Sequence, residues 1–341
     1  HTIALQHPPS RNIQLPHRIS KSENGLRQSC KISDITLTPP PGDARFRRYF
    51  RQQLAEGSTR IFMDAPPEKE NCQPFLRIEQ RLRAAGVHVP AVFAQDLEQG
   101  FLLLEDLGDE LYLDVLAEAT VERLYGDALS TLMVMQACVD TSGLPVYDDE
   151  LLQREMSLFR DWLLLQHLRI TLTDAEEQML AQAFQLLSRS ALEQPGVFVH
   201  RDYHSRNLLP GVAPVPGVID FQDAVSGPST YDLVSLLRDC YISWPQRQVD
   251  EWTMGYFQLC VQSGLLRDEH EEHFVRWFDL MGVQRHLKAA GIFARLNHRD
   301  GKPGYLQDIP RTLGYISQVG ERQPDIQRLA GFIQEKVLPA L

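Results

Sequence analysis

The stretch from Val197 to Asp223 reads VFVHRDYHSRNLLPGVAPVPGVIDFQD and holds the most polar cluster in the chain. A predicted apolar strand leads into Asp202, Asn207 follows five residues later, and a second apolar strand leads into Asp220. Two short strands joined by a tight loop place these three side chains around one point. Their oxygen atoms are hard ligands suited to Mg²⁺, and one carboxylate remains to orient a hydroxyl group.

Each residue of this cluster also has an ordinary structural interpretation. Asp and Asn are common turn residues, so Asp202 and Asn207 taken singly are ambiguous. We expect His200 to be a structural histidine that binds the loop backbone, and Arg201 to brace a neighbouring carboxylate or loop. Asp223 is either a second metal ligand or a cap at the start of a helix.

The order His-Arg-Asp, four residues, Asn, and then Asp-Phe after a short strand resembles the catalytic loop and metal motif of the protein-kinase-like superfamily. The resemblance implies that Asp202 is the catalytic base and Asn207 a metal ligand. It implies that Asp220 joins Mg²⁺ to the phosphates of ATP. It also implies a two-lobed α+β fold, with a small, mainly antiparallel N-lobe that carries one helix and a larger, mostly α-helical C-lobe.

The segment after Asp220 narrows the resemblance. Protein kinases have a long activation loop after their metal-binding aspartate, whereas here Gly227 to Leu233 already begins a helix. This is similar to the aminoglycoside phosphotransferase-like branch, whose members phosphorylate hydroxyl groups of small molecules. By that similarity Asp232 braces the catalytic loop from behind; the alternative is a favourable charge at a helix N-terminus.

Hydrophobic periodicity and turn signals predict the lobes along the chain. We expect a weakly ordered extension over 1–33, a nucleotide-binding N-lobe over 34–106, and a C-lobe over 107–341 that carries the catalytic loop and binds the acceptor. The N-lobe should contain a five-stranded sheet and one helix: strands at 35–38, 46–51, 60–63, 87–94 and 101–104, and a helix at 75–85. C-lobe helices are predicted at 121–139, 150–168, 174–192, 230–242, 246–263, 268–296 and 325–336, and its strands at 197–199, 207–209 and 218–219.

The nucleotide side departs from the kinase pattern. The resemblance places the ATP phosphates under the turn of Gly42, Asp43 and Arg45, helped by cations such as Arg48, and adenine against backbone groups of Glu105, Asp106 and Leu107. The turn does not match the Gly-x-Gly-x-x-Gly pattern of a phosphate-binding loop. Its arginines could instead lie on a solvent-exposed strand face without binding phosphate. Residues 60–64 contain no strand lysine, so Lys69 or an arginine of the first hairpin would substitute. A catalytically silent nucleotide-binding scaffold is the alternative that this loss leaves open.

Charge and composition exclude several other classes of protein. The formal net charge of −11 disfavours sequence-independent binding to nucleic acid or anionic lipid, which both need basic surface. No apolar run approaches the ~18 residues of a membrane span. The five cysteines are scattered and form no Cys-x-x-Cys pair, which disfavours a disulfide framework and a zinc site. With no signal peptide apparent, we expect a cytoplasmic protein with a small-molecule substrate.

A closer resemblance covers the chain from about residue 36 to its end. Seven segments resemble bacterial anomeric kinases of N-acetylmuramate and N-acetylglucosamine: GDARFRRYFR (42–51), MDAPP (63–67), AGVHVP (85–90), IDFQDA (219–224), MGVQRHLK (281–288), GIFARL (291–296) and HRDGKP (298–303). The resemblance implies ATP- and Mg²⁺-dependent phosphorylation of the carbon-1 hydroxyl in peptidoglycan recycling. A kinase for another hydroxylated metabolite or an aminoglycoside is the alternative.

The lactyl carboxylate of N-acetylmuramate calls for a cation in the acceptor site. The candidates are Arg206 beside the catalytic loop and Arg285, His286 and Arg295 on the long C-terminal helix, with ion pairs among acidic helices as the alternative. In similar kinases the helix that carries Glu155 and Trp162 forms part of the acceptor pocket, although core packing explains these two equally well.

Overall fold

The computed structural model describes residues 47–54, 56–211 and 215–341. The predicted extension, the strand at 35–38 and the turn of Gly42, Asp43 and Arg45 lie outside the described residues. The described chain divides into two compact units. The first comprises the described residues up to Gln73 together with Pro90–Asp109, and the second comprises Pro74–Val89 and Glu110–Leu341.

The first unit is an antiparallel sheet. Within the described residues it has four strands in the order β1-β2-β4-β3: β1 (Arg48–Gln53), β2 (Thr59–Asp64), β3 (Val92–Asp96) and β4 (Phe101–Glu105). The apolar run of β4 is buried, and β4 pairs with both β2 and β3. Gly100, in the turn just before β4, has φ +73°, and a Cβ there would lie 2.0 Å from the carbonyl oxygen of Ala65, so only glycine fits.

The strand predicted at 87–94 is shorter and later than expected. It begins at Val92, because the preceding segment makes its backbone contacts in the second unit. There the carbonyl of His88 accepts the N–H of Val218 (2.8 Å), and the N–H of Val87 binds the carbonyl of Leu82 (2.9 Å). The preceding helix, α2 (Gln73–Ala84), also packs in the second unit, where the ring of Phe75 lies 4.9 Å from that of Phe221.

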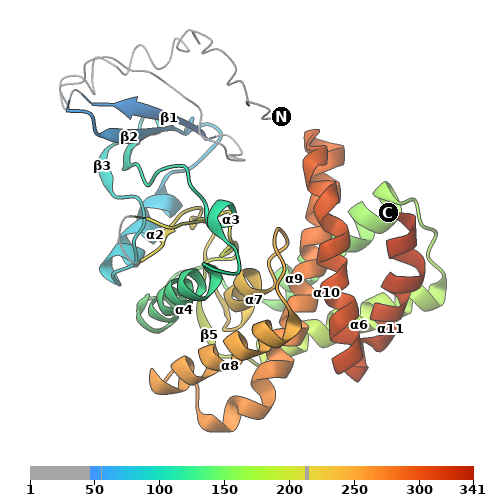
Figure 1. The fold of residues 1–341 in the computed structure, drawn as a ribbon. Coiled ribbons are helices and arrows are strands. Elements are labelled where there is room, and N and C mark those ends of the chain that lie inside the picture. Colours follow the sequence, from blue (N-terminus) through green and yellow to red (C-terminus); the bar gives the residue numbers. More distant parts are fainter. Residues whose placement is uncertain (1–46, 55, 212–214) are drawn as a thin grey trace, which may run out of the picture. The chain divides into compact units, whose positions relative to one another are not determined.

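The second unit is mainly helical, as predicted (Figure 1). The long helix α9 (Glu271–Asp300) packs against many of the other helical elements of this unit. Among them are α5 (Asp149–Leu158), the π-helix η1 (Phe159–His167), α6 (Asp174–Leu192), α7 (Tyr231–Leu237) and α10 (Ile309–Arg322). The other helical elements are α3 (Tyr112–Val115), α4 (Val121–Cys138), α8 (Gln246–Gln262), η2 (Asp268–His270), η3 (Pro303–Asp308), η4 (Pro324–Ile326), α11 (Gln327–Phe332), η5 (Ile333–Val337) and η6 (Leu338–Ala340).

Close backbone approach explains how α9 and its neighbours fit together. Gly291 of α9 faces the junction of α5 and η1, where a Cβ would meet the carbonyl carbon of Leu158 at 2.3 Å. Residues 150–168, predicted as one helix, change from α to π geometry at this junction. α10 was not predicted at all; its Gly320 permits close contact with Ala330, since a Cβ there would lie 2.3 Å from the Cβ of Ala330.

Two short strand pairs in the second unit carry the polar cluster. β5 (Gly196–Val199) pairs antiparallel with β8 (Val225–Pro228), a strand that the sequence did not predict. β6 (Leu208–Leu209) pairs antiparallel with β7 (Gly217–Val218). The fold class expected from the sequence, an antiparallel sheet lobe and a helical lobe, is confirmed. No helix in the described ranges has the length and apolar character needed to cross a membrane.

Candidate active site

The strand pair β6–β7 brings the two halves of the motif together. The N–H of Ile219 donates to the carbonyl of Asn207 (3.1 Å), which continues the pairing of Leu208 with Val218. The side-chain amide of Asn207 donates to the backbone carbonyl of Asp202 (2.9 Å). Asn207 is therefore held next to Asp202, and Asp220 follows Ile219 at the end of the hairpin.

His200 links the same two loops through its ring. Its Nε2 lies 2.9 Å from the carbonyl oxygen of Ile219, and its Nδ1 lies 3.2 Å from the backbone nitrogen of Asp202. A carbonyl can only accept, so Nε2 carries the hydrogen and Nδ1 accepts the N–H of Asp202. The ring is fully buried. This is the structural histidine that the sequence suggested.

Asp232 supports the catalytic loop through two hydrogen bonds to its backbone. Its carboxylate oxygens accept the backbone N–H groups of His200 (2.6 Å) and Arg201 (3.0 Å). Burial raises the pKa of Asp232 to about 6, against the opposing effect of His200 and these two hydrogen bonds. The geometry fits a residue that braces the loop.

Two residues of the motif have left-handed backbone conformations. Arg201 has φ +80° and Asp220 has φ +63°, values that residues other than glycine seldom adopt. Such conformations persist where surrounding contacts over-determine them, and they cluster at functional sites. Here the Asp232 hydrogen bond to Arg201 and the β6–β7 hairpin supply those contacts.

Asp239 is a second support, which the sequence analysis did not identify. Its fully buried carboxylate accepts the backbone N–H groups of Ser205 (2.8 Å) and Tyr241 (2.8 Å). It therefore fixes the catalytic loop between Asp202 and Asn207. Asp239 lies two residues beyond the end of α7 at Leu237, and no local sequence pattern marked it as a support.

Glu155 joins the loop to α9. Its carboxylate binds the guanidinium of Arg201, lies 3.2 Å from Nζ of Lys288, and accepts the hydroxyl of Tyr147. Lys288 also donates to the hydroxyl of Tyr231 (2.8 Å). Three partners inside the protein and a buried side chain are evidence against the predicted role of Glu155 as an acceptor ligand. Glu155 instead sets the position of Arg201, as expected for an arginine that braces a carboxylate.

Lys288 was missed as a site residue, although it lies in a segment that supported the family resemblance. Burial alone would raise the pKa of Asp202, but the charge of Lys288, followed by those of His204 and Arg285, lowers it to about 2. Asp202 is therefore ionised at neutral pH. The sequence feature that could have revealed Lys288 is its position three residues after Arg285, which places both cations on one face of α9.

Asp220 shows the opposite behaviour. Its pKa is raised, mainly because neighbouring atoms partly desolvate the carboxylate. The negative charge of Asp202 is the second cause. The residue is nevertheless exposed to solvent. The side-chain amide of Gln222 donates to it (2.6 Å) and acts against the rise. Two close carboxylates that repel each other are stabilised by a cation placed between them.

The donor set is compatible with Mg²⁺. No group of three or more His, Cys, Asp or Glu side chains within the described ranges is arranged to hold a metal by itself. Mg²⁺ at phosphoryl-transfer sites needs fewer protein ligands, because it keeps water ligands and binds substrate phosphates alongside one or two carboxylates. Asp223 lies in the turn before β8 and not at a helix start, so its alternative role as a helix cap is wrong.

The nucleotide candidates that the structure describes lie in the first unit. Arg48 forms an ion pair with the buried carboxylate of Asp64, directly opposite it in the β1–β2 register. Asp106 binds Arg51 (2.5 Å) and accepts the N–H of Gly108 (2.9 Å). The side chain of Glu105 accepts the N–H of Ala91 (3.2 Å). Two further candidates, Lys69 in a turn after β2 and Leu107 after β4, are also in this unit.

The acceptor candidates separate by exposure. His286 is buried, its Nε2–H donates to the carbonyl of Arg238 (2.8 Å), and its ring stacks on Tyr315. Burial lowers its pKa to about 3, so it is a neutral core residue, which is evidence against its predicted contact with the acceptor. Arg285 is also buried, near the sulfur of Cys240 (3.7 Å). Arg206, Arg295 and Trp162 are only partly buried.

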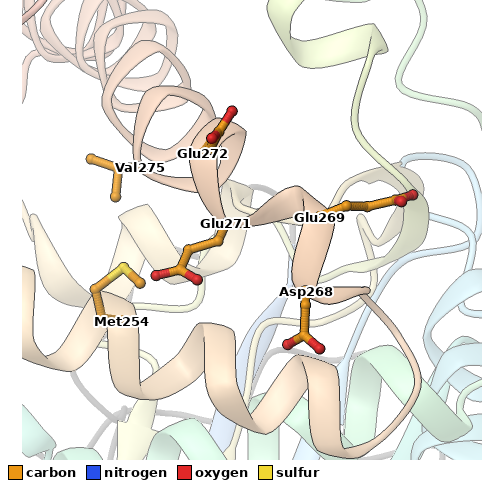
Figure 2. A pocket seen from close by; sticks show the side chains of 6 residues that line it. All are labelled: Met254, Asp268, Glu269, Glu271, Glu272 and Val275. Carbon is orange, nitrogen blue, oxygen red and sulfur yellow. The ribbon is translucent and has the colours of Figure 1, made fainter.

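A separate hollow of about 850 Å³ lies between α8, η2 and the start of α9 (Figure 2). It contains none of the candidate residues. Carboxylates dominate its lining, which would repel phosphate groups. Its lining residues are Met254, Asp268, Glu269, Glu271, Glu272 and Val275.

Comparison with known proteins identifies relatives over most of the chain. The chain is 49% identical over 300 residues to the N-acetylmuramate/N-acetylglucosamine kinase of Pseudomonas putida, with 88% of each chain covered. It is 40% identical over 321 residues to the protein of the same name from Neisseria meningitidis, covering 93% of this chain and 95% of the relative.

Solved structures share the fold at low sequence identity. An ADP-bound aminoglycoside phosphotransferase, APH(2'')-Ib, matches with a TM-score of 0.58 at 16% identity, over 87% of this chain and 97% of that one. The choline kinase LicA of Streptococcus pneumoniae matches with a TM-score of 0.59 at 12% identity, over 88% and 99%. The model of the phosphotransferase enzyme family matches residues 36–275. Because this family model matches most of the chain, and relatives at 40–49% identity cover 88% or more of it, the chain belongs to the phosphotransferase enzyme family.

Proposed function

We propose that this protein is a kinase that transfers the γ-phosphate of ATP to the carbon-1 hydroxyl of N-acetylmuramate, N-acetylglucosamine or both. The observation that carries the proposal is the hydrogen-bonded loop that holds Asn207 against Asp202 and leads through the β6–β7 hairpin to Asp220. The names of relatives at 40–49% identity supply the acceptor. The product would enter peptidoglycan recycling in the cytoplasm.

Asp202 acts on the acceptor hydroxyl. With a pKa of about 2 it is a weak base, so it orients the hydroxyl and takes the proton late, as the phosphorus–oxygen bond forms. An anomeric hydroxyl is more acidic than an ordinary alcohol, which suits a weak base. Rate acceleration then rests on positioning and charge neutralisation, as is general for phosphoryl transfer.

Asn207, Asp220 and Asp223 would hold Mg²⁺ beside Asp202. The raised pKa of Asp220 is support from the structure, because a cation relieves the repulsion that causes part of it. When bound, the metal neutralises charge on the ATP phosphates. The residues of the chain keep Asp202 and Asp220 apart and oriented, through His200 and the β6–β7 hairpin.

The nucleotide would be bound by an N-lobe that spans about 34–106, and a C-lobe of 107–341 would carry the catalytic loop and the acceptor site. Gly42, Asp43 and Arg45 would contact the phosphates, and backbone groups of Glu105, Asp106 and Leu107 would contact adenine. To bind a phosphate, Arg48 would have to loosen or break its ion pair with Asp64. Lys69 is the other candidate for the cation that binds the phosphates.

The relatives support this acceptor over an aminoglycoside. Relatives at 40–49% identity are named for the two amino sugars, whereas the aminoglycoside phosphotransferase APH(2'')-Ib is 16% identical. ATP consumption in the presence of either sugar, with the phosphate located on the product, tests the proposal; binding without turnover would favour the silent scaffold.

A further inference from the structure

We propose that Arg206, Tyr241 and Tyr305 form a carboxylate-binding clamp that holds the lactyl group of N-acetylmuramate beside the catalytic loop. The inference rests on the proposed function and assigns a site for the chemical group that distinguishes the two sugars. These three residues are called the tyrosine–arginine clamp below.

The clamp is built from three separate elements. Arg206 lies in the catalytic loop between Asp202 and Asn207, and its guanidinium carbon is 4.8 Å from the ring centre of Tyr241 and 5.2 Å from that of Tyr305. The backbone of Tyr241 is fixed by Asp239 (2.8 Å). The ring of Tyr305, in η3, stacks on Phe293 of α9, with 5.7 Å between centres and 16° between planes.

Contact with aromatic faces prepares an arginine to bind a carboxylate. The guanidinium is planar, and its N–H groups form a fork that matches the two oxygens of a carboxylate. Rings that hold the group in place reduce the entropy lost when a ligand binds. All three clamp residues are partly exposed, so a ligand can reach them.

Arg206 differs from the other three cations near the loop because, among the described residues, it is both partly exposed and without a carboxylate partner. Arg201 and Lys288 are both paired with Glu155, and Arg285 is buried. For Arg206, no carboxylate in the described part of the chain lies within ion-pair distance. Asp308, whose pKa is influenced by Arg206, is itself paired with Arg311 (2.9 Å).

The chemistry of the two sugars matches this arrangement. N-acetylmuramate is N-acetylglucosamine with a lactyl ether, which adds one carboxylate to an otherwise identical ring. A cation that binds this carboxylate improves the use of N-acetylmuramate and contributes nothing comparable to the other sugar. The clamp is therefore a specificity determinant for the reaction that Asp202 carries out.

The test measures kcat/KM for both sugars and takes the ratio of N-acetylmuramate to N-acetylglucosamine. For Arg206→Leu the ratio is expected to fall at least tenfold, which is about 1.4 kcal/mol. Arg206→Lys keeps the charge but loses the fork, and is expected to lie between Arg206→Leu and wild type. Tyr305→Leu should lower the ratio, and Tyr305→Phe, which keeps the ring, should largely retain it. Arg247→Leu removes a distant, exposed arginine of α8 and should leave the ratio at the wild-type value.

The outcomes separate this inference from the proposed function. Phosphorylation of both sugars with an unchanged ratio in Arg206→Leu and Arg206→Lys overturns the clamp and leaves the kinase assignment intact. If wild type phosphorylates neither sugar, the proposed function fails and the clamp loses its ligand. Turnover of N-acetylglucosamine by each variant shows that the variant is folded.

Discussion

The carboxylate of Glu155 on α5 binds the guanidinium of Arg201, the residue immediately before Asp202. The same carboxylate lies 3.2 Å from Nζ of Lys288 on α9. One buried carboxylate therefore ties the catalytic loop to both α5 and α9.

Replacing Glu155 with Gln leaves the partly buried Arg201 and the buried Lys288 without their shared counter-charge. We expect the free energy of unfolding to fall by about 3 kcal/mol, the usual cost of breaking a buried pair. We also expect kcat to fall at least tenfold with little change in the KM for ATP, because the position of Asp202 changes. Steady-state kinetics and denaturant unfolding measure both.

The control is Glu150→Gln on the same helix, where the exposed side chain lies 3.6 Å from Arg154. It should change neither quantity appreciably. A double-mutant cycle with Arg201→Gln tests the route of the effect. If Glu155 acts through Arg201 the two losses in kcat are not additive, whereas additive losses would contradict this positioning role.

Gly291 provides a second test of the link between α5 and α9. A Cβ at this position would lie 2.3 Å from the carbonyl carbon of Leu158 and 2.5 Å from its oxygen, both backbone atoms that cannot move aside cheaply. Gly291→Ala should therefore destabilise the protein by about 3 kcal/mol. It should also lower kcat, because α5 carries Glu155 and α9 carries Lys288.

Gly314→Ala in α10 is the matched control, since nothing lies within 4 Å of its added Cβ. Alanine favours a helix over glycine, so this variant should be neutral or more stable by about 0.5–1 kcal/mol. Thermal unfolding compares the two variants. Equal stability of Gly291→Ala and wild type would show that the helices are not packed as closely as described.

Asp232 gives a prediction for pH dependence. Its pKa in the folded protein, about 6, is raised above the unfolded value, so the folded state binds this proton more tightly. The contribution of Asp232 to stability is therefore fully present below about pH 4 and is lost as the pH rises to about 6. The free energy of unfolding of wild type minus that of Asp232→Asn should fall over this range by about 3 kcal/mol.

Asp232→Asn should also lower kcat at neutral pH. An amide presents one acceptor and one donor, so one of the N–H groups of His200 and Arg201 loses its partner. The same substitution at the exposed Asp268 controls for loss of a carboxylate. A wild-type minus variant difference that grows with pH would contradict the raised pKa.

The sequence predicted those parts of the site that depend on local spacing. Asp202, Asn207 and Asp220 are brought together because a tight hairpin connects short strands, and both are visible in the chain. Asp232 was found by similarity and lies where a loop support must lie. The long helices were predicted because apolar residues recur at helical spacing, as in α6.

Features that depend on tertiary contacts were missed or misassigned. The role of Glu155 is set by residues 46 and 133 positions away along the chain, Arg201 and Lys288, and no local pattern reveals such pairs. His286 looked available for a ligand, yet packing places it against Tyr315 in the core. α10 contains Pro310 and glycines, which weaken a helix signal, but Gly320 is what allows its close packing.

The carbon atom that carries the phosphate in the product distinguishes the proposed kinase from its alternatives. N-acetylmuramate, ATP and Mg²⁺ are incubated with wild type or Asp202→Asn, and the product is analysed by phosphorus NMR with carbon–phosphorus couplings. We predict phosphate on carbon 1 with wild type, and a rate lower by about 10²–10⁴-fold with Asp202→Asn. Phosphate on carbon 6, or no phosphorylated sugar at all, would contradict it.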